Sequence, residues 1–177
     1  REDWCNFPCP DPDSSRMKAP QKGLVHATSV ALGIDHDGPL CGVAILGDSG
    51  SGKSQLALSL MERCIYARTR LVADDLTKVE VRGTQLVARL PDHSFGAIEI
   101  RGGGIARVTR KSAIPLRFAL QIQDRSETRL PAMTEWSPLG ASAPSVPQLI
   151  WPVRRHHGLV VLIRSLLSGH SLQGGFD

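Results

Sequence analysis

Residues 47–54, GDSGSGKS, form the stretch whose residue types and spacing point most directly to chemistry. They match G-x-x-x-x-G-K-[ST], in which glycines allow successive backbone N–H groups to turn toward a phosphate. The lysine can reach the β- and γ-phosphates of a nucleotide, and the hydroxyl after it can ligate Mg²⁺. An apolar run, CGVAIL, precedes the loop, and QLALSLMERC follows it with helical spacing. This context favours a phosphate site over a plain glycine-rich connection. The predicted phosphate-binding residues are Gly47, Asp48, Ser49, Gly50, Ser51, Gly52, Lys53 and Ser54.

Two acidic segments follow the loop. LVADD ends an apolar run with Asp74 and Asp75. A magnesium–nucleotide site needs a carboxylate near the metal, and a kinase gains from another that orients or deprotonates the acceptor hydroxyl. Neighbouring strand residues point to opposite sides, so the two aspartates should do different jobs, although their spacing leaves open which one faces the phosphates. Glu99 in AIEIRGGG is the other acidic candidate, and Arg101 can pair with it on one strand face. Turn-forming aspartates and a water-facing glutamate are the non-functional alternatives.

The elements that must position these residues can be read from the apolar periodicity. Residues 53–64 are predicted to be a helix, and the four prolines within 131–147 indicate a loop. Residues 157–167 favour a closing helix, with a strand as the alternative. The predicted strands are 24–32, 43–46, 71–73, 97–100 and 116–122, with a hairpin that joins 77–82 to 85–90.

Composition narrows the class of protein. The chain has 177 residues, 41% of them hydrophobic and 21% charged, which is typical of a soluble globular domain. Its formal net charge of +4 favours anionic ligands, whereas 5% aromatic residues and scattered basic residues argue against nucleic-acid binding. The apolar runs are too short to span a membrane and no signal peptide is apparent, so a cytoplasmic protein is expected.

The ends of the chain are expected to lie outside the folded domain. Residues 1–22 read as a disordered leader, and Met17 within it is a candidate natural start that would make residues 1–16 upstream or non-native sequence. A folded domain is expected over 23–170, followed by a tail at 171–177. Among the cysteines, Cys41 and Cys64 read as core or near-core residues, and the two in the leader as free thiols rather than a disulfide or metal site.

The order of the motifs resembles the HPr kinase/phosphorylase family, most closely its short forms that lack an N-terminal domain. VHATSVALG, GVAILGDSGSGKS, RLVADD, GAIEIRGGGI and RLP carry the resemblance, and PVRRHHGLVVLIRSLL extends it more loosely. It implies an α/β phosphate-loop kinase core related to phosphoenolpyruvate carboxykinase, with a mixed sheet and flanking helices. It also implies that a serine of the phosphocarrier protein HPr is phosphorylated with ATP or pyrophosphate and Mg²⁺, that inorganic phosphate reverses the reaction, and that the protein is a homo-hexamer.

The resemblance assigns roles to individual residues. Asp75 would accept the seryl proton in the kinase direction and donate it in the reverse. His26 would contact the aspartate pair, although a satisfied core histidine is its non-functional alternative. Arg129 would be the catalytic arginine on the acceptor side, with a surface charge as its alternative. The catalytic residues so implied are His26, Lys53, Asp75 and Arg129, and the implied Mg²⁺ ligands are Ser54 and Glu99.

Three departures and two alternatives qualify this interpretation. The segments 33–41 and 64–70 are longer than in the family, and PVRRHHG differs from the PVRPGR-like segment associated with dephosphorylation, which makes phosphorolysis less well supported than nucleotide binding. A small-metabolite kinase would also use the phosphate loop, but it should carry a lid with clustered arginines. A nucleotide-sensing module without chemistry should lack Asp75 or Glu99.

Overall fold

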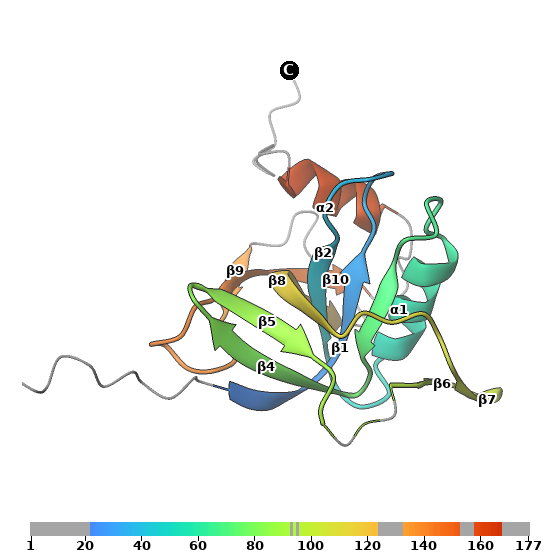
Figure 1. Ribbon diagram of the computed structural model, residues 1–177, viewed down its shortest axis with the longest axis horizontal. Helices are drawn as coiled ribbons and strands as arrows, with labels where there is room; N and C mark the ends of the chain where they lie inside the picture. Colours follow the sequence, from blue (N-terminus) through green and yellow to red (C-terminus); the bar gives the residue numbers. More distant parts are fainter. Residues whose placement is uncertain (1–21, 93, 95, 124–132, 153–157, 168–177) are drawn as a thin grey trace, which may run out of the picture.

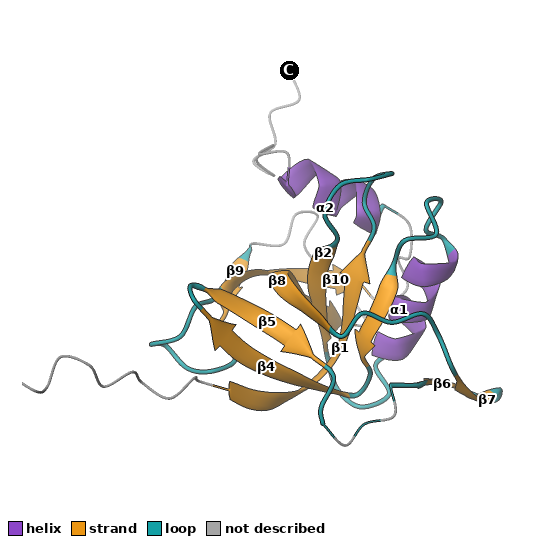
Figure 2. Cartoon of the chain, viewed as in Figure 1, coloured by secondary structure: helices purple, strands orange, loops and turns teal. Residues whose placement is uncertain are grey.

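The structure is a computed structural model, and it describes residues 22–92, 94, 96–123, 133–152 and 158–167. Three parts of the sequence predictions lie outside the described residues: Arg129, residues 1–21 with their two cysteines, and the tail. Lys22, which was expected to end the disordered leader, instead begins the first strand. Within the described residues the fold is mixed α/β, with an eight-stranded mixed sheet, a separate two-stranded hairpin and two helices (Figure 2). None of the described helices is long and apolar enough to cross a membrane.

The large sheet closes partly on itself. Its order is β2-β1-β4-β5-β8-β10-β9, β3 pairs with β1, and β2 also pairs with β8, so that β1, β4, β5, β8 and β2 form a ring. Most pairs are antiparallel, whereas β2–β8 and β8–β10 are parallel. The strands are β1 (Lys22–Leu32), β2 (Cys41–Leu46), β3 (Arg70–Ala73), β4 (Leu76–Arg82), β5 (Gln85–Arg89), β8 (Ala113–Gln123), β9 (Thr134–Trp136) and β10 (Val146–Pro152).

Two hydrophobic clusters hold the sheet in place. One lies on the side covered by both helices, α1 (Lys53–Glu62) and α2 (Leu159–Leu167), and joins their buried leucines to Val30 of β1 and Leu120 of β8 (Figure 1). The other cluster is rich in alanine, for example Ala27 and Ala31 of β1. Because β1 buries both of its faces from Ala27 onward, its exposed side chains lie only near its start, which is where the candidate site lies.

Most of the predicted elements are present. The expected hairpin is β4–β5, the helix after the glycine loop ends at Glu62, and the closing segment is helical from Leu159. The prediction that 131–147 is all loop was wrong, because it contains β9 and the start of β10. Its prolines are compatible with strands because Pro147 lies at one end of β10, where the strand pairs only with the short edge strand β9.

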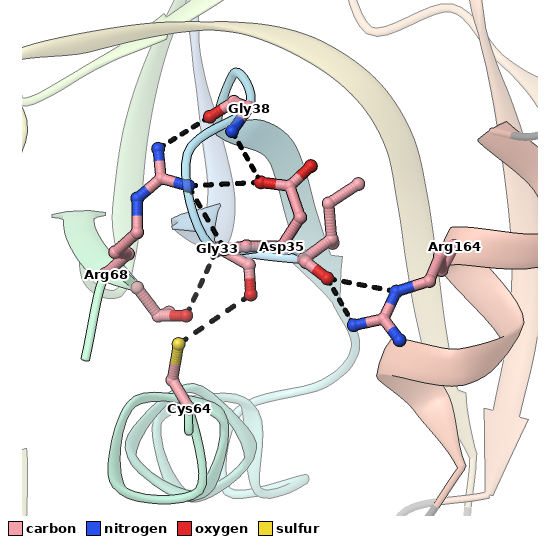
Figure 3. A network of polar contacts seen from close by, with 8 residues as sticks. Gly33, Asp35, Gly38, Cys64, Arg68 and Arg164 are labelled. Carbon is pink, nitrogen blue, oxygen red and sulfur yellow. Dashed lines mark hydrogen bonds and ion pairs between the residues drawn. The ribbon is translucent and has the colours of Figure 1, made fainter. Parts of the chain in front are cut away.

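The two segments that were expected to be longer than in the family, 33–41 and 64–70, contact each other. Within 33–41, Gly38 N donates to Asp35 Oδ1 at 2.8 Å, which closes a tight loop. Arg68, from 64–70, donates to the backbone and side-chain oxygens of Asp35, both at 3.1 Å, and to the carbonyl of Gly38 (Figure 3). The two loops therefore hold each other through Arg68.

The C-terminal helix also contacts these loops. Arg164 of α2 donates two hydrogen bonds to the carbonyl of Ile34, and the Cys64 thiol donates to the carbonyl of Gly33 at 3.7 Å (Figure 3). These bonds satisfy carbonyls just beyond the end of β1, a position where the strand ladder no longer provides donors. The network ties the loops to α1 and α2.

Candidate functional site

The phosphate loop joins β2 to α1, as the sequence context predicts. Gly50 and Gly52 have φ values of 77° and 97°, in the left-handed region that L side chains rarely adopt. Gly47 also has a positive φ, 152°, and a Cβ added there would lie 2.6 Å from Ser51 Oγ and 2.8 Å from Ile122 Cγ1. The loop conformation therefore depends on its glycines.

The loop leaves polar groups that a ligand can satisfy. Gly52 is the N-cap of α1, no side chain caps the helix, and no acidic residue lies in its first turn. The positive end of the helix dipole and its amides therefore remain available to an anion. Ser51 Oγ is the one buried side-chain polar atom among the described residues that has no hydrogen-bond partner. Such an atom in a native site calls for water, an ion or a ligand.

Lys53 lies at the centre of the site. It is only 6% exposed, and its Nζ donates to the carbonyls of Gly47 at 3.0 Å and Asp48 at 2.9 Å. Its remaining contact is with His26 Nε2 at 3.0 Å. A protonated lysine has three N–H donors and no acceptor, so these contacts use all of them. The ammonium thus braces the phosphate loop and connects it to β1.

His26 connects Lys53 to Asp75. Because Lys53 can only donate, Nε2 of His26 must accept and its proton resides on Nδ1. That Nδ1 lies 3.2 Å from Asp75 Oδ1. Asp75 has φ of 65°, a conformation that aspartate tolerates better than most residues, and its side chain is 74% exposed. Lys53, His26 and Asp75 therefore form a continuous line of contacts from the phosphate loop to a carboxylate open to solvent.

Asp74 points to different partners from its neighbour. Its Oδ1 accepts hydrogen bonds from Ser54 Oγ at 2.7 Å and from Thr28 Oγ1 at 2.8 Å. The sequence left open which aspartate faces the phosphates, and in the structure Asp74 contacts the phosphate-loop helix whereas Asp75 contacts His26. Thr28, which no motif marked, was detectable only by its alternation with His26 on β1.

Opposite the loop, a small hairpin completes a cavity of about 1060 Å³. It consists of β6 (Ile98–Ile100) and β7 (Gly104–Ala106), which project beyond α1 in Figure 1. Residues from both sides line the cavity: Ser49, Gly50, Lys53, Ser54, Asp74, Asp75, Glu99 and Arg101. The predicted glutamate thus shares one cavity with the phosphate loop and both aspartates.

Arg101 differs from its expected arrangement. The ion pairs among described residues do not include one between Glu99 and Arg101, because β6 ends at Ile100 and places Arg101 in the turn. Its guanidinium instead lies over the phosphate loop, where Nη2 is 3.5 Å from the position that a Cβ on Gly50 would occupy. This positive group close to the loop was not recognised from the sequence as a phosphate contact.

The donors around Ser54 fit a magnesium ion. Among the described residues no group of three or more His, Cys, Asp or Glu side chains could hold a metal ion. Mg²⁺ in nucleotide sites, however, takes few protein ligands and completes its shell with water and phosphate oxygens. The hydroxyl of Ser54 and the carboxylate of Asp74, 2.7 Å apart, are oxygen donors of that kind.

The fold and the loop define a mixed α/β domain in which a loop of the phosphate-binding type leads into the N-terminus of a helix. The family model of the HPr serine kinase C-terminal domain matches residues 33–125, more than half of the chain. The chain therefore belongs to the HPr serine kinase C-terminal domain family.

Curated relatives and a solved structure agree with this membership. HPr kinase/phosphorylase from Treponema pallidum (strain Nichols) is 39% identical over 99 residues, covering 54% of this chain and 28% of that protein. The protein of that name from Clostridium perfringens is 30% identical over 144 residues, covering 75% of this chain and 45% of its own. The Hpr(Ser) kinase/phosphatase structure from Coxiella burnetii aligns with a TM-score of 0.63 at 25% identity, covering 84% of this chain and 95% of that one. The chain spans less than half the length of these curated relatives.

Proposed function

We propose that this chain transfers the γ-phosphoryl group of ATP, with Mg²⁺, to a serine of an HPr-type phosphocarrier protein. Family membership supports the reaction class, since the curated relatives are named HPr kinase/phosphorylase. The observation that carries the proposal for this chain is the line of contacts from Lys53 through His26 to Asp75. This line joins Lys53, an ammonium group suited to hold phosphates, to Asp75, a carboxylate suited to accept a proton.

The phosphate loop would hold the donor. Its backbone amides and the uncapped start of α1 would bind the β- and γ-phosphates, and Lys53 would exchange one of its present acceptors for a phosphate oxygen. Arg101, over Gly50, would add a further positive charge on the open side of the cavity. These fixed charges favour the charge distribution of the transferring phosphoryl group.

Asp75 would act on the acceptor. The seryl oxygen forms a bond to the γ-phosphorus while the bond from that phosphorus to the bridging oxygen of ADP breaks, and Asp75 takes the seryl proton. The Nδ1–H of His26 would hold the carboxylate in position. Because the Asp75 side chain is 74% exposed, the acceptor position is open to a protein surface. A small-metabolite kinase encloses its acceptor instead, so this exposure favours a protein substrate.

A magnesium ion, when bound with the nucleotide, supplies charge neutralisation between the phosphates. Ser54 would hold it directly, with Asp74 fixing the Ser54 hydroxyl and contributing its own carboxylate. Thr28 would keep the carboxylate of Asp74 oriented. Glu99 is a further proposed ligand, since it lines the same cavity.

The remaining features of the resemblance extend the proposal. We include reversal of the reaction, in which inorganic phosphate attacks phosphoserine and Asp75 returns the proton. Use of pyrophosphate as an alternative donor, a catalytic role for Arg129, a hexameric assembly and a cytoplasmic location belong to the same proposal. Their support is the family membership alone.

The proposal is tested by incubating the purified chain with HPr, Mg²⁺ and γ-labelled ATP. We expect acid-stable label on HPr and none when the acceptor serine is replaced by alanine. A Lys53→Met variant should bind nucleotide poorly and transfer no label. If the wild-type chain binds ATP but labels no acceptor under varied nucleotide and phosphate conditions, it is a nucleotide sensor and the proposal is wrong.

A further inference from the structure

We infer that Leu24 and Leu76 form a docking surface for the acceptor protein, on which an apolar side chain next to the phosphorylated serine rests. This inference depends on the proposed function, because it concerns the same acceptor. The two leucines are 63% and 42% exposed. They belong to β1, which carries His26, and to β4, which follows Asp75.

The register of β1 and β4 places these leucines beside the proposed base. The strands are antiparallel, with His26 opposite Leu76 and Leu24 opposite Lys78. Directly opposed residues share a sheet face, as do residues two positions apart along a strand. Leu24, His26 and Leu76 therefore lie together on one face, which we call the outer face of β1–β4.

Residues on the other face hold this register. Val25 packs against the alanine-rich cluster, and Thr77 is fully buried. Thr77 Oγ1 donates to the carbonyl of Ala27 at 2.8 Å and lies 2.9 Å from Ser29 Oγ. A slip of one residue would move Thr77 into solvent and break both contacts, so the leucines are fixed on the outer face.

The position of Leu76 next to Asp75 indicates that the molecule bound on the outer face is the acceptor protein. Leu76 directly follows Asp75, so a protein that brings a serine hydroxyl to the Asp75 carboxylate must also approach Leu76. A small metabolite has no reason to cover Leu24 as well, two positions from His26 along β1. Lys78, directly opposite Leu24, forms an ion pair through its Nζ with Asp92 Oδ2 at 2.7 Å. The outer face thus combines an apolar centre with a charged margin, the usual anatomy of a protein interface.

The test compares HPr phosphorylation by wild type, by the double variant Leu24→Ser/Leu76→Ser, and by Leu24→Met/Leu76→Met. We expect the serine variant to raise KM for HPr by about tenfold or more, as loss of two partly buried leucine contacts implies, with kcat changed by less than about threefold. The methionine variant, which keeps apolar side chains of similar size, should have the KM of wild type. Ile65→Ser is the matched control, because Ile65 is 83% exposed just beyond the C-terminal end of α1 and should leave KM unchanged.

The outcomes separate this inference from the proposed function. If wild type phosphorylates HPr and the serine variant has the same KM, the docking surface is wrong while the proposed function stands. If wild type does not phosphorylate HPr, the proposed function is wrong, and the docking surface that depends on it is wrong as well. If the serine variant changes the oligomeric state measured by light scattering instead of KM, the leucines contact a second copy of the chain, and the inference is overturned. ADP affinity, measured by calorimetry, should be equal in all variants, which confirms that each is folded.

Discussion

Replacing Asp75 with asparagine removes the proposed proton acceptor with the smallest structural change. Asp75 has φ of 65°, and asparagine adopts this left-handed conformation readily. Alanine there would add a strain of about 1–2 kcal/mol. The two side chains of the His26–Asp75 contact are 43% and 74% exposed, so loss of this contact should lower the free energy of unfolding by less than about 1 kcal/mol. Asp75→Asn should therefore be folded.

The effect on catalysis should be much larger than the effect on stability. General-base catalysis contributes about 10²–10⁴-fold, which corresponds to about 3–5 kcal/mol in the activation barrier. Among the described residues, hydrogen bonds and ion pairs link Asp75 to the phosphate loop only through His26, so nucleotide affinity should change by less than about threefold. The expected pattern is a fall in kcat for HPr phosphorylation with unchanged ADP binding.

The assay combines label transfer to HPr with calorimetric titration of ADP. Thermal unfolding of the same samples verifies that the variant is folded, and Asp75→Ala should be the less stable of the two variants. A rate for Asp75→Asn within about threefold of wild type would refute the role assigned to Asp75. Loss of ADP binding together with activity would show that Asp75 instead maintains the phosphate loop.

Three further predictions concern other parts of the structure. Arg101→Gln, which removes a charge over the phosphate loop, should weaken ADP binding by about tenfold and leave adenosine binding unchanged in calorimetry. For Glu80, burial raises the pKa but hydrogen bonds from two arginines lower it by more, so the pKa of this carboxyl lies below its ordinary value and its ionised form stabilises the fold above that ordinary value. Because solvent screens these ion pairs, Glu80→Gln should lower the free energy of unfolding by less than about 1 kcal/mol near neutral pH. The difference from wild type should disappear as the pH falls through the lowered pKa of Glu80, which urea unfolding at several pH values will measure. Burial raises the pKa of the Cys41 thiol to about 11, whereas at Cys64 burial is outweighed by several hydrogen bonds that together lower the pKa, so iodoacetamide with peptide mapping should label Cys64 much faster. Equal labelling would contradict that difference.

The loop and the elements around it were predictable because local patterns determine them. The glycine spacing, the apolar run of β2 and the helical spacing of α1 are contiguous in the chain, so a short window contains the evidence. β9 and β10 were not predictable in the same way. β10 contains two prolines and forms a strand because β8 offers a long partner for parallel pairing, and β9 then pairs with β10 in the antiparallel direction.

The candidate site was predictable in its residue types but only partly in its contacts. The family resemblance implied that His26 contacts the aspartate pair, as it does at Asp75, yet no sequence pattern shows that His26 also reaches Lys53 or that Asp74 turns to Ser54. Those contacts depend on the register of β1 with β3 and β4. The suggested pairing of Glu99 with Arg101 does not occur, because it required Arg101 to lie on the same strand face, whereas Arg101 lies in the turn after β6.

The most direct test of the central claim is to map phosphate on HPr by mass spectrometry after incubation with the chain, ATP and Mg²⁺. The account predicts one phosphorylated serine with wild type, none with Lys53→Met, and a trace with Asp75→Asn. An unmodified HPr in the wild-type reaction, or full phosphorylation by Asp75→Asn, would contradict it.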